Sequence, residues 1–156
     1  MPELRQQVML CRSASDALAS PNLVDVAKVH TRQWVCTEII AIMAKGMLAI
    51  DEKRRMHPEV LALWVDEMVD HFGYESIADF RVFSRGLATG KWEDKEFYSS
   101  IDGPRMTKWF RRYLEEKSDA RERTNDADKA PEDVIEGMKA VGLDAQLIKE
   151  LAQKAG

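Results

Sequence analysis

The chain has 156 residues, of which 45% are hydrophobic and 32% charged, and its formal net charge is −4. This length allows one domain with a true hydrophobic core, and five prolines and eight glycines are few for the many tight turns of an all-β fold. No apolar run approaches the roughly 18 residues that cross a bilayer. The N-terminal segment, with its early Glu3, does not resemble a secretory signal. Cys11 and Cys36 form no paired motif, so we expect a protein in a reduced, cytoplasmic setting. Together with the lack of a long apolar run, this predicts no membrane partner.

Apolar residues at spacings of three and four predict helices through most of the first half. The predicted helical segments there are residues 2–19, 23–51 and 58–72. Ser13 and Ser15 weaken the first, which is either one helix or a broken one, and the charged run at 51–55 predicts a solvated connection before the third. Pro58 suits the first turn of that third helix, because the missing N–H would have no helical partner there.

Capping residues predict the helices of the second half. Ser76, followed three residues later by Asp79, predicts a capping box and a helix that ends between residues 86 and 90. Residues 91–101 are irregular, and Asp102 before Gly103-Pro104 predicts the next helix start. One face of that helix is apolar and consists of Met106, Trp109, Phe110, Tyr113 and Leu114.

Composition changes after this helix. Residues 115–133 hold eight acids, four bases and no large apolar side chain, which predicts either an exposed continuation of the helix or a linker. Pro131 then opens two short amphipathic helices that can hardly bury their apolar faces alone, so this hairpin must pack back, pair with another copy or dock on a partner. The candidate partner-binding residues are Val134, Met138, Leu147 and Leu151. The sequence thus predicts an all-α, compact helical bundle with domains at 1–19, 20–123 and 124–156.

Catalytic patterns are weak. Glu67 and His71 share a helix face, but metal sites normally need three or four ligands. Neither cysteine has a nearby histidine, and GLATGK at 86–91 lacks the length and the Ser/Thr of a phosphate-binding loop. We therefore predict a non-enzymatic protein with no catalytic residues, no metal site and no cofactor.

A local excess of positive charge is the best-supported binding feature. Between residues 81 and 112 the chain has eight Lys/Arg against four Asp/Glu. Such a face can neutralise phosphates, and an exposed Trp92 or Tyr98 can stack on a base. The alternative is a solvated face paired with local acids, with the aromatic residues in the core. The candidate nucleic-acid-binding residues are Arg81, Arg85, Lys91, Trp92, Lys95, Arg105, Lys108, Arg111 and Arg112.

The same region contains a series of helix-capping and aromatic residues. They are Tyr74, Ser76-Ile77-Ala78-Asp79, Phe83, Gly90, Tyr98, Ile101-Asp102-Gly103, Trp109, Phe110 and Tyr113. With weaker similarity from about residue 20, this series resembles an uncharacterised group of small helical proteins of Bacteroidetes, their phages and mobile elements. The chain departs from that pattern at Ser76, where the group has Leu-Thr, and in the more charged loop at 91–100.

The resemblance implies a helical accessory protein of a phage or mobile element, in the cytoplasm of the host cell, and carries over no catalytic residue. We therefore expect a factor that acts in DNA transactions by contacting DNA or a replication protein through its basic residues. The alternative is a protein-interaction or assembly module, such as a virion component or an inhibitor of a host protein, for which a homo-oligomer is also possible.

Overall fold

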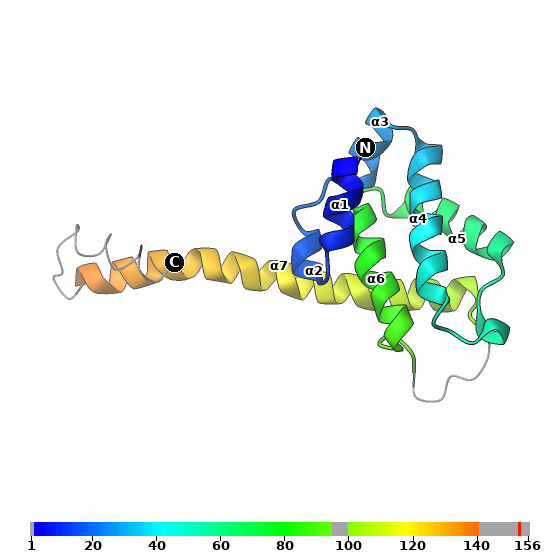
Figure 1. Ribbon diagram of the computed structural model, residues 1–156. Coiled ribbons are helices and arrows are strands. Elements are labelled where there is room, and N and C mark those ends of the chain that lie inside the picture. Colours follow the sequence, from blue (N-terminus) through cyan, green and yellow to red (C-terminus); the bar gives the residue numbers. More distant parts are fainter. Residues whose placement is uncertain (1, 95–99, 141–152, 154–156) are drawn as a thin grey trace. The chain divides into compact units, whose positions relative to one another are not determined.

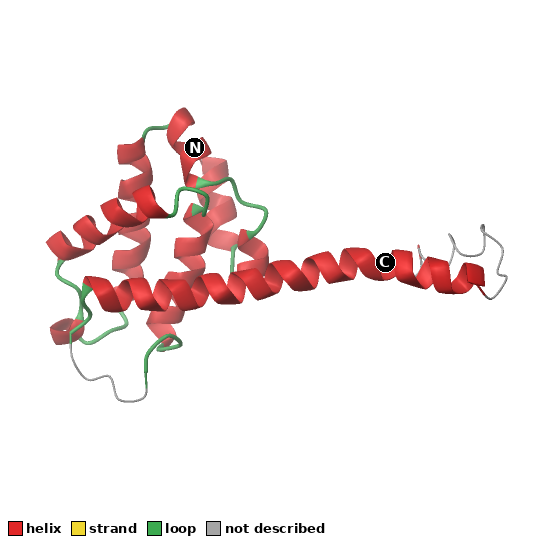
Figure 2. Ribbon diagram, turned by 180° about the vertical axis from the view of Figure 1, so that it is seen from behind, coloured by secondary structure: helices red, strands yellow, loops and turns green. Residues whose placement is uncertain are grey.

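The computed structural model describes residues 2–94, 100–140 and 153, with the backbone alone at residues 127–140. Its described elements are helices, and the isolated bridge between Asn22 and Ser76 is the only β pairing among these residues (Figure 2). This confirms the all-α prediction. In chain order the elements are α1 (Pro2–Leu10), α2 (Ala14–Ala17), α3 (Leu23–Val29), α4 (Arg32–Met47), the 3₁₀ turn η1 (Glu52–Arg54), α5 (Pro58–His71), α6 (Ile77–Thr89) and α7 (Gly103–Ala140).

The chain divides into two compact units, residues 1–117 and 118–156. The first unit contains α1 to α6 and the beginning of α7, and it holds the hydrophobic core. The second contains the rest of α7, which is helical through Ala140. No described helix combines the length and the apolar character that crossing a membrane requires.

Two predicted helices are broken by side chains that cap a new start. The pattern at 23–51 predicts one helix, which is wrong, because α3 ends at Val29 and the Thr31 side chain accepts a hydrogen bond from the Trp34 N–H to begin α4. Ser13 likewise forms a capping box with Asp16 and starts α2 after α1 has ended. The break at Ser13 is the one that the serines of the loose first pattern indicated, whereas the apolar period continues through Thr31, so the period alone did not reveal the second break.

The predicted caps of the second half are confirmed. Ser76 and Asp79 form a reciprocal capping box at the start of α6. This helix ends at Gly90, whose φ of 73° lies in the left-handed region that glycine adopts without a steric penalty. At the start of α7, the Asp102 carboxylate accepts a hydrogen bond from the Arg105 N–H.

Within the first unit, α4 and α6 pack side by side, α5 packs on α4, and α1 and α2 pack on α6 (Figure 1). Gly46 permits the close approach of α4 to α6, because a Cβ there would lie 1.9 Å from the Ser84 Oγ. The same hydroxyl donates a 2.9 Å hydrogen bond to the Ile42 carbonyl.

Aromatic rings from α5, α6 and α7 form the centre of the core. The Phe110 ring of α7 stacks on Phe80 at 4.7 Å and meets Phe83 edge-on at 5.2 Å. Phe72 and Trp64 approach the same ring at 5.3 and 6.3 Å. The predicted apolar face of the helix that starts at Asp102 is thus the middle of the first unit.

The predicted C-terminal hairpin needs one correction. Its first helix does not start at Pro131, because residues 131–140 continue α7 without a break. The helical alternative for residues 115–133 is therefore the one observed. Val134 and Met138 lie in this helix, but their side chains are outside the described part, and Leu147 and Leu151 lie outside the described residues altogether.

Candidate functional surfaces

The predicted basic residues come from three consecutive segments. Arg81 and Arg85 lie on α6, and Lys91 and Trp92 follow it in the loop. Lys95 lies outside the described residues. The remaining four are on the first part of α7, namely Arg105, Lys108, Arg111 and Arg112.

Several of these cations are paired with acids of the same region. Arg112 forms a 2.7 Å ion pair with Asp94, and Lys108 approaches the same carboxylate at 3.9 Å. The hydrogen bond from Arg112 holds the pKa of Asp94 below its ordinary value. Lys91 forms a 2.8 Å pair with Glu116. Part of the local positive charge is thus neutralised within the protein.

Trp92 is a core residue. Its side chain is only 6% exposed, and its indole N–H donates a 3.0 Å hydrogen bond to the Phe83 carbonyl. Arg112 donates to the Trp92 carbonyl at 2.9 Å and fixes the loop on α7. The ring is therefore not available to stack on a base, and the alternative that placed the aromatic residue in the core is correct for Trp92.

One basic surface remains open. It is a shallow hollow of about 710 Å³, which we call the α7 outer face, and it is lined by Pro104, Thr107, Lys108, Arg111, Arg112 and Glu115. Arg111 is exposed and has no ion pair with the described residues. Arg85 on α6 is exposed as well, whereas Arg81 is half-buried and lines a different pocket.

A second surface is apolar and lies between α4 and α5. This α4–α5 groove has a volume of about 440 Å³, and its floor is formed by the buried side chains of Met47, Met56 and Leu61. The other lining residues are Ile40, Ala44, Glu52, Arg55, His57 and Pro58.

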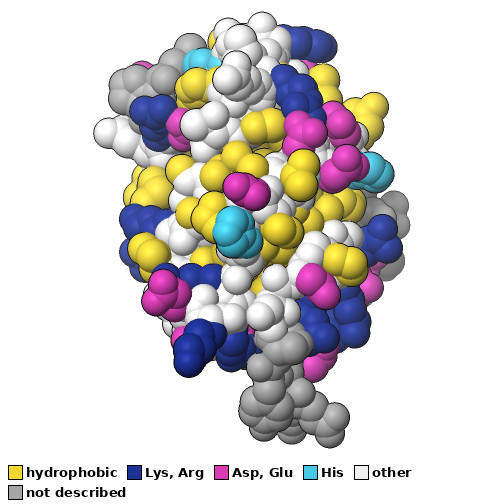
Figure 3. Space-filling view, turned by 90° about the vertical axis from the view of Figure 1, so that its right-hand side faces the viewer, with side chains coloured by type: hydrophobic (Ala, Val, Ile, Leu, Met, Phe, Trp, Pro, Cys, Tyr) yellow, Lys and Arg dark blue, Asp and Glu magenta, His cyan; other side chains and the backbone are white. Residues whose placement is uncertain are grey.

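Large aliphatic side chains stand exposed on the same two helices and their ends. Leu48 is 66% exposed, Leu63 68% and Val60 41%. Figure 3 shows hydrophobic side chains gathered on this side of the molecule, with acidic and histidine side chains among them and Lys and Arg mainly towards the edge. Exposed apolar side chains on the helices that flank a concave apolar groove are typical of a protein-binding surface.

The width of the apolar arc on α4 produces this groove. Ile39, Met43 and Met47 form one row at spacings of four and are fully buried or nearly so. Ile40, Ala44 and Leu48 form the adjacent row, which the neighbouring helices leave half-buried or exposed. The spacing of apolar residues predicts a helix here, but it does not show which row the neighbouring helices leave uncovered, so the groove was missed.

Arg55 fixes the edge of the groove. Its Nε donates a 2.8 Å hydrogen bond to the Ile50 carbonyl, and its Nη2 donates a 3.0 Å bond to the Leu48 carbonyl. These bonds satisfy two carbonyls at the C-terminal end of α4. The turn that carries Leu48 is thereby held in place before any partner binds.

The buried polar cluster of the first unit is structural. Asp79 is fully buried and accepts hydrogen bonds from the Ser76 N–H and hydroxyl, the Tyr113 hydroxyl and the Lys117 ammonium group. Lys117 also pairs with Glu75. Burial, together with the charge of Asp79, raises the pKa of Tyr113 far above its ordinary value. Each of these groups already has a partner, so the cluster stabilises the junction of α6 with α7.

The remaining candidates for chemistry do not converge. Among the described residues, no three His, Cys, Asp or Glu side chains lie close enough to hold a metal ion. His71 approaches Glu67 at 3.8 Å without a further ligand in this part of the chain. Burial raises the pKa of both Cys11 and Cys36, which favours the unreactive thiol.

Comparison with protein-family models, curated proteins and solved structures finds no match to this chain. The resemblance to phage and mobile-element proteins therefore stays a prediction.

Proposed function

We propose that the protein is a non-enzymatic interaction module that binds an apolar helix face of a partner protein in the α4–α5 groove. The observations that support this most strongly are the concave apolar floor of the groove and the exposure of Leu48, Val60 and Leu63 on the helices that flank it. Partner helices of this kind present side chains at positions i, i+3, i+4 and i+7 to such a groove.

Burial of the exposed leucines supplies the driving force. Removing apolar surface from water contributes about 25 cal/mol per Å², so two leucines and a valine stabilise a complex substantially once a partner covers them. Met47 and Met56 on the floor add adaptable, polarisable surface that accepts different side-chain shapes.

The charged residues at the rim of the groove determine the orientation of the partner helix more than its binding affinity. Glu52, Arg55 and His57 place both signs of charge at one end of it, with no large excess of either. Because the contacts are mainly apolar, binding here depends little on salt. That behaviour separates this mode from phosphate recognition, whose affinity falls steeply with ionic strength.

A displayed library of amphipathic helices tests the proposal without a known partner. The library is selected on the wild-type protein and counter-selected on Leu63→Glu, and the recovered peptides are titrated by calorimetry. We expect apolar positions at i, i+3, i+4 and i+7, and affinity that falls at least about tenfold in Leu48→Glu or Leu63→Glu, because a charge must then be buried. Lys28→Glu, on the exposed side of α3, is the matched control.

Two outcomes contradict the proposal. One is recovery of no helix that binds the wild type above background. The other is a set of peptides whose affinity is the same in Leu63→Glu as in Lys28→Glu. Both variants change an exposed residue, so far-ultraviolet circular dichroism of each protein establishes that the fold is intact before the titrations are compared.

A second candidate function uses the α7 outer face. Lys108, Arg111 and Arg112 line one open hollow, and Arg111 lacks an ion pair with the described residues. This arrangement supports contact with DNA, as expected for an accessory factor in the DNA transactions of a phage or mobile element. A replication protein with an acidic surface would be an alternative ligand for the same face.

Anisotropy of labelled single- and double-stranded DNA at about 50 and 200 mM salt tests this second candidate, because phosphate contacts weaken over that range. We expect Arg111→Glu to weaken binding and Asp94→Asn to strengthen it, since the latter frees Lys108 and Arg112 from their shared carboxylate. Absence of binding at the lower salt concentration would exclude it.

A further inference from the structure

A separate pocket lies between α1, α4 and α6, on residues of α4 other than those that line the α4–α5 groove. Its volume is about 220 Å³, and we call it the α1–α4–α6 pocket. Apolar side chains make up most of its wall, namely Leu4, Val8, Met9, Trp34, Ala41, Ile42 and Ile77.

The charged residues of the pocket are mostly cations. Arg5, Lys45 and Arg81 line it together with a single acid, Glu38. Glu38 is already occupied, because it accepts hydrogen bonds of 2.6 and 3.2 Å from Arg5. Two positive charges therefore remain without a counter-charge in the lining.

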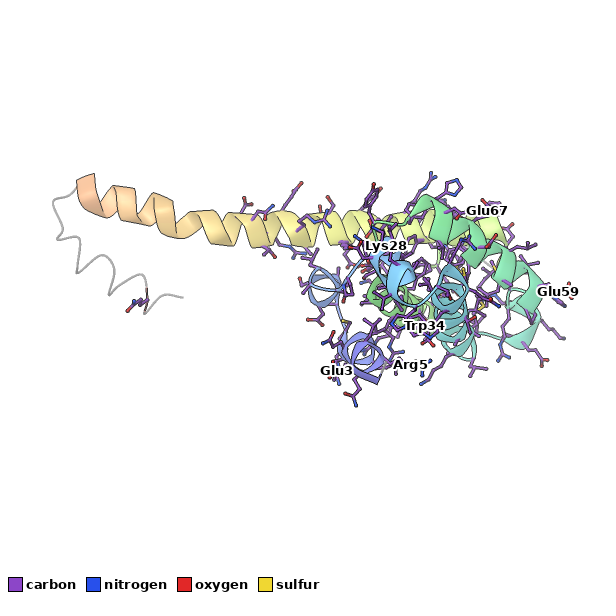
Figure 4. All side chains as sticks on the ribbon, turned by 90° about the horizontal axis from the view of Figure 1, so that it is seen from above. Glu3, Arg5, Lys28, Trp34, Glu59 and Glu67 are labelled. Atoms are coloured by element: carbon purple, nitrogen blue, oxygen red, sulfur yellow. The ribbon has the colours of Figure 1, made fainter. Side chains whose placement is uncertain are left out.

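Arg5 also closes one side of the pocket. Its guanidinium lies 5.8 Å from the centre of the Trp34 ring, and Figure 4 places Arg5 of α1 beside Trp34 of α4. The ring is itself stacked on His30 at 4.2 Å. Trp34 thus offers a fixed aromatic wall rather than a mobile side chain.

Arg81 is the unusual member of the lining. The residue is half-buried, and its Nε is buried without a hydrogen-bond partner among the described residues. A buried donor without an acceptor costs free energy, and a guanidinium matches a carboxylate with two parallel hydrogen bonds. The pocket thus combines an apolar interior with an unmatched donor group suited to an anion.

We propose that the α1–α4–α6 pocket binds a small amphiphilic monocarboxylate, an aliphatic or aromatic acid whose body lies against Trp34 and Ile42 and whose carboxylate is held by Arg81. Lys45 adds a second positive charge at the same site. The ligand must be small, because sites for drug-sized molecules measure about 300–1,000 Å³ while a cavity of about 150 Å³ holds one benzene ring.

Octanoate is the probe for a calorimetric titration of the full chain, with octan-1-ol and octylamine as neutral and cationic analogues of equal length. We expect octanoate to bind more tightly than either analogue. In Arg81→Gln the octanoate affinity falls about ten- to a hundredfold, the range for loss of a charge-assisted hydrogen bond. Arg85→Gln, four residues along the same helix and exposed, is the matched control and leaves the affinity unchanged.

Ala41→Phe provides a second variant that does not touch the charges. Filling the pocket removes octanoate binding while circular dichroism and the thermal midpoint stay near those of the wild type. Iodide quenching gives an independent readout, because Trp34 is half-exposed whereas Trp64, Trp92 and Trp109 are buried. Bound octanoate shields the quenchable fluorescence.

Three results overturn the proposal. They are no octanoate binding to the wild type at millimolar concentration, equal binding of octan-1-ol, and an affinity that survives both Arg81→Gln and Ala41→Phe. None of these results bears on the α4–α5 groove, so this site and the proposed function are tested independently.

Discussion

The α4–α5 groove and the α7 outer face are both exposed, but they differ in how many of their side chains already have a partner within the protein. On the outer face, Lys108 and Arg112 share the carboxylate of Asp94. On the helices that flank the groove and its buried floor, Leu48 and Leu63 remain about two-thirds exposed. A solvated charge that already has a local ion-pair partner is stabilised little by a further protein. Exposed apolar surface, in contrast, is stabilised when a partner covers it and removes it from water. Because of this difference, we propose the groove rather than the α7 outer face as the main binding surface.

The largest expected effect concerns the interior, where charge is satisfied completely. Asp79→Ala leaves the Tyr113 hydroxyl buried without its acceptor and leaves Glu75 as the remaining partner of the buried Lys117 ammonium group. We expect a loss of about 3–5 kcal/mol in the free energy of unfolding, as for other broken buried pairs. Urea denaturation measures it, and a loss below about 1 kcal/mol would show that the cluster is not the structural junction described here.

Two leucines on α5 sharpen the contrast between the floor of the groove and the exposed surface of the helix beside it. Leu61 is 3% exposed and Leu63 68%, although they are only two residues apart. Leu61→Ala should lower the free energy of unfolding by about 2–5 kcal/mol through loss of burial and a cavity. Leu63→Ala should change it by no more than about 0.5 kcal/mol. Denaturation of the two variants side by side checks this, and equal losses would mean that Leu63 belongs to the core.

Gly46 tests the packing that directs the second apolar row of α4 away from α6. Helix propensity alone predicts that Gly46→Ala stabilises α4 by about 1 kcal/mol. The contact with Ser84 predicts the opposite sign, a loss of about 1–3 kcal/mol, because the new methyl group overlaps the hydroxyl. The thermal midpoint of this variant separates the two, and an increase would refute the close packing.

Alkaline pH probes the Asp79 cluster through Tyr113. Burial raises the pKa of this tyrosine, so the folded chain keeps a proton that the unfolded chain releases near pH 10. The stabilisation is complete below that pH and decreases as the pH rises above it, by at most about 1.4 kcal/mol per pH unit. Tyr113→Phe should show a flatter decrease in denaturant titrations between about pH 9 and 11. Identical slopes would contradict the assignment.

The smallest effect is expected on the α7 outer face. Asp94→Asn removes an exposed ion pair and should cost less than about 1 kcal/mol, in contrast with Asp79→Ala. Chemical denaturation of the variant measures the cost. A loss comparable with that of Asp79→Ala would mean that the loop carrying Trp92 depends on this pair for its position.

The parts of the fold that depend on neighbouring residues were predictable from the sequence. Ser76 and Asp79 are three residues apart, and their capping box follows from that spacing alone. The contacts of Asp79 with Tyr113 and Lys117 span 34 and 38 residues, so the sequence indicated a cap but not a buried junction. Thr31 was missed because an N-cap inside a continuing apolar period has no distinct signal.

Surfaces were harder to predict than elements. The sequence located the excess of Lys and Arg at 81–112, but their pairing with Asp94 and Glu116 depends on how the loop packs on α7. The apolar spacing at 23–51 likewise predicted helix without indicating which row of α4 the other helices cover. The separate environment of Arg81, away from the α7 outer face, likewise depends on the packing of α1 against α6.

Site-specific photo-crosslinking tests the central claim by the same comparison. A benzophenone residue is placed at position 63, on the helix α5 that flanks the groove, or at position 111 on the α7 outer face, and the protein is irradiated in cell extract. We predict a protein adduct at 63 that disappears with Leu48→Glu and re-forms from the purified partner and the wild-type chain. Adducts only at 111, or adducts at 63 that Leu48→Glu leaves unchanged, would contradict the assignment of the α4–α5 groove as the binding surface.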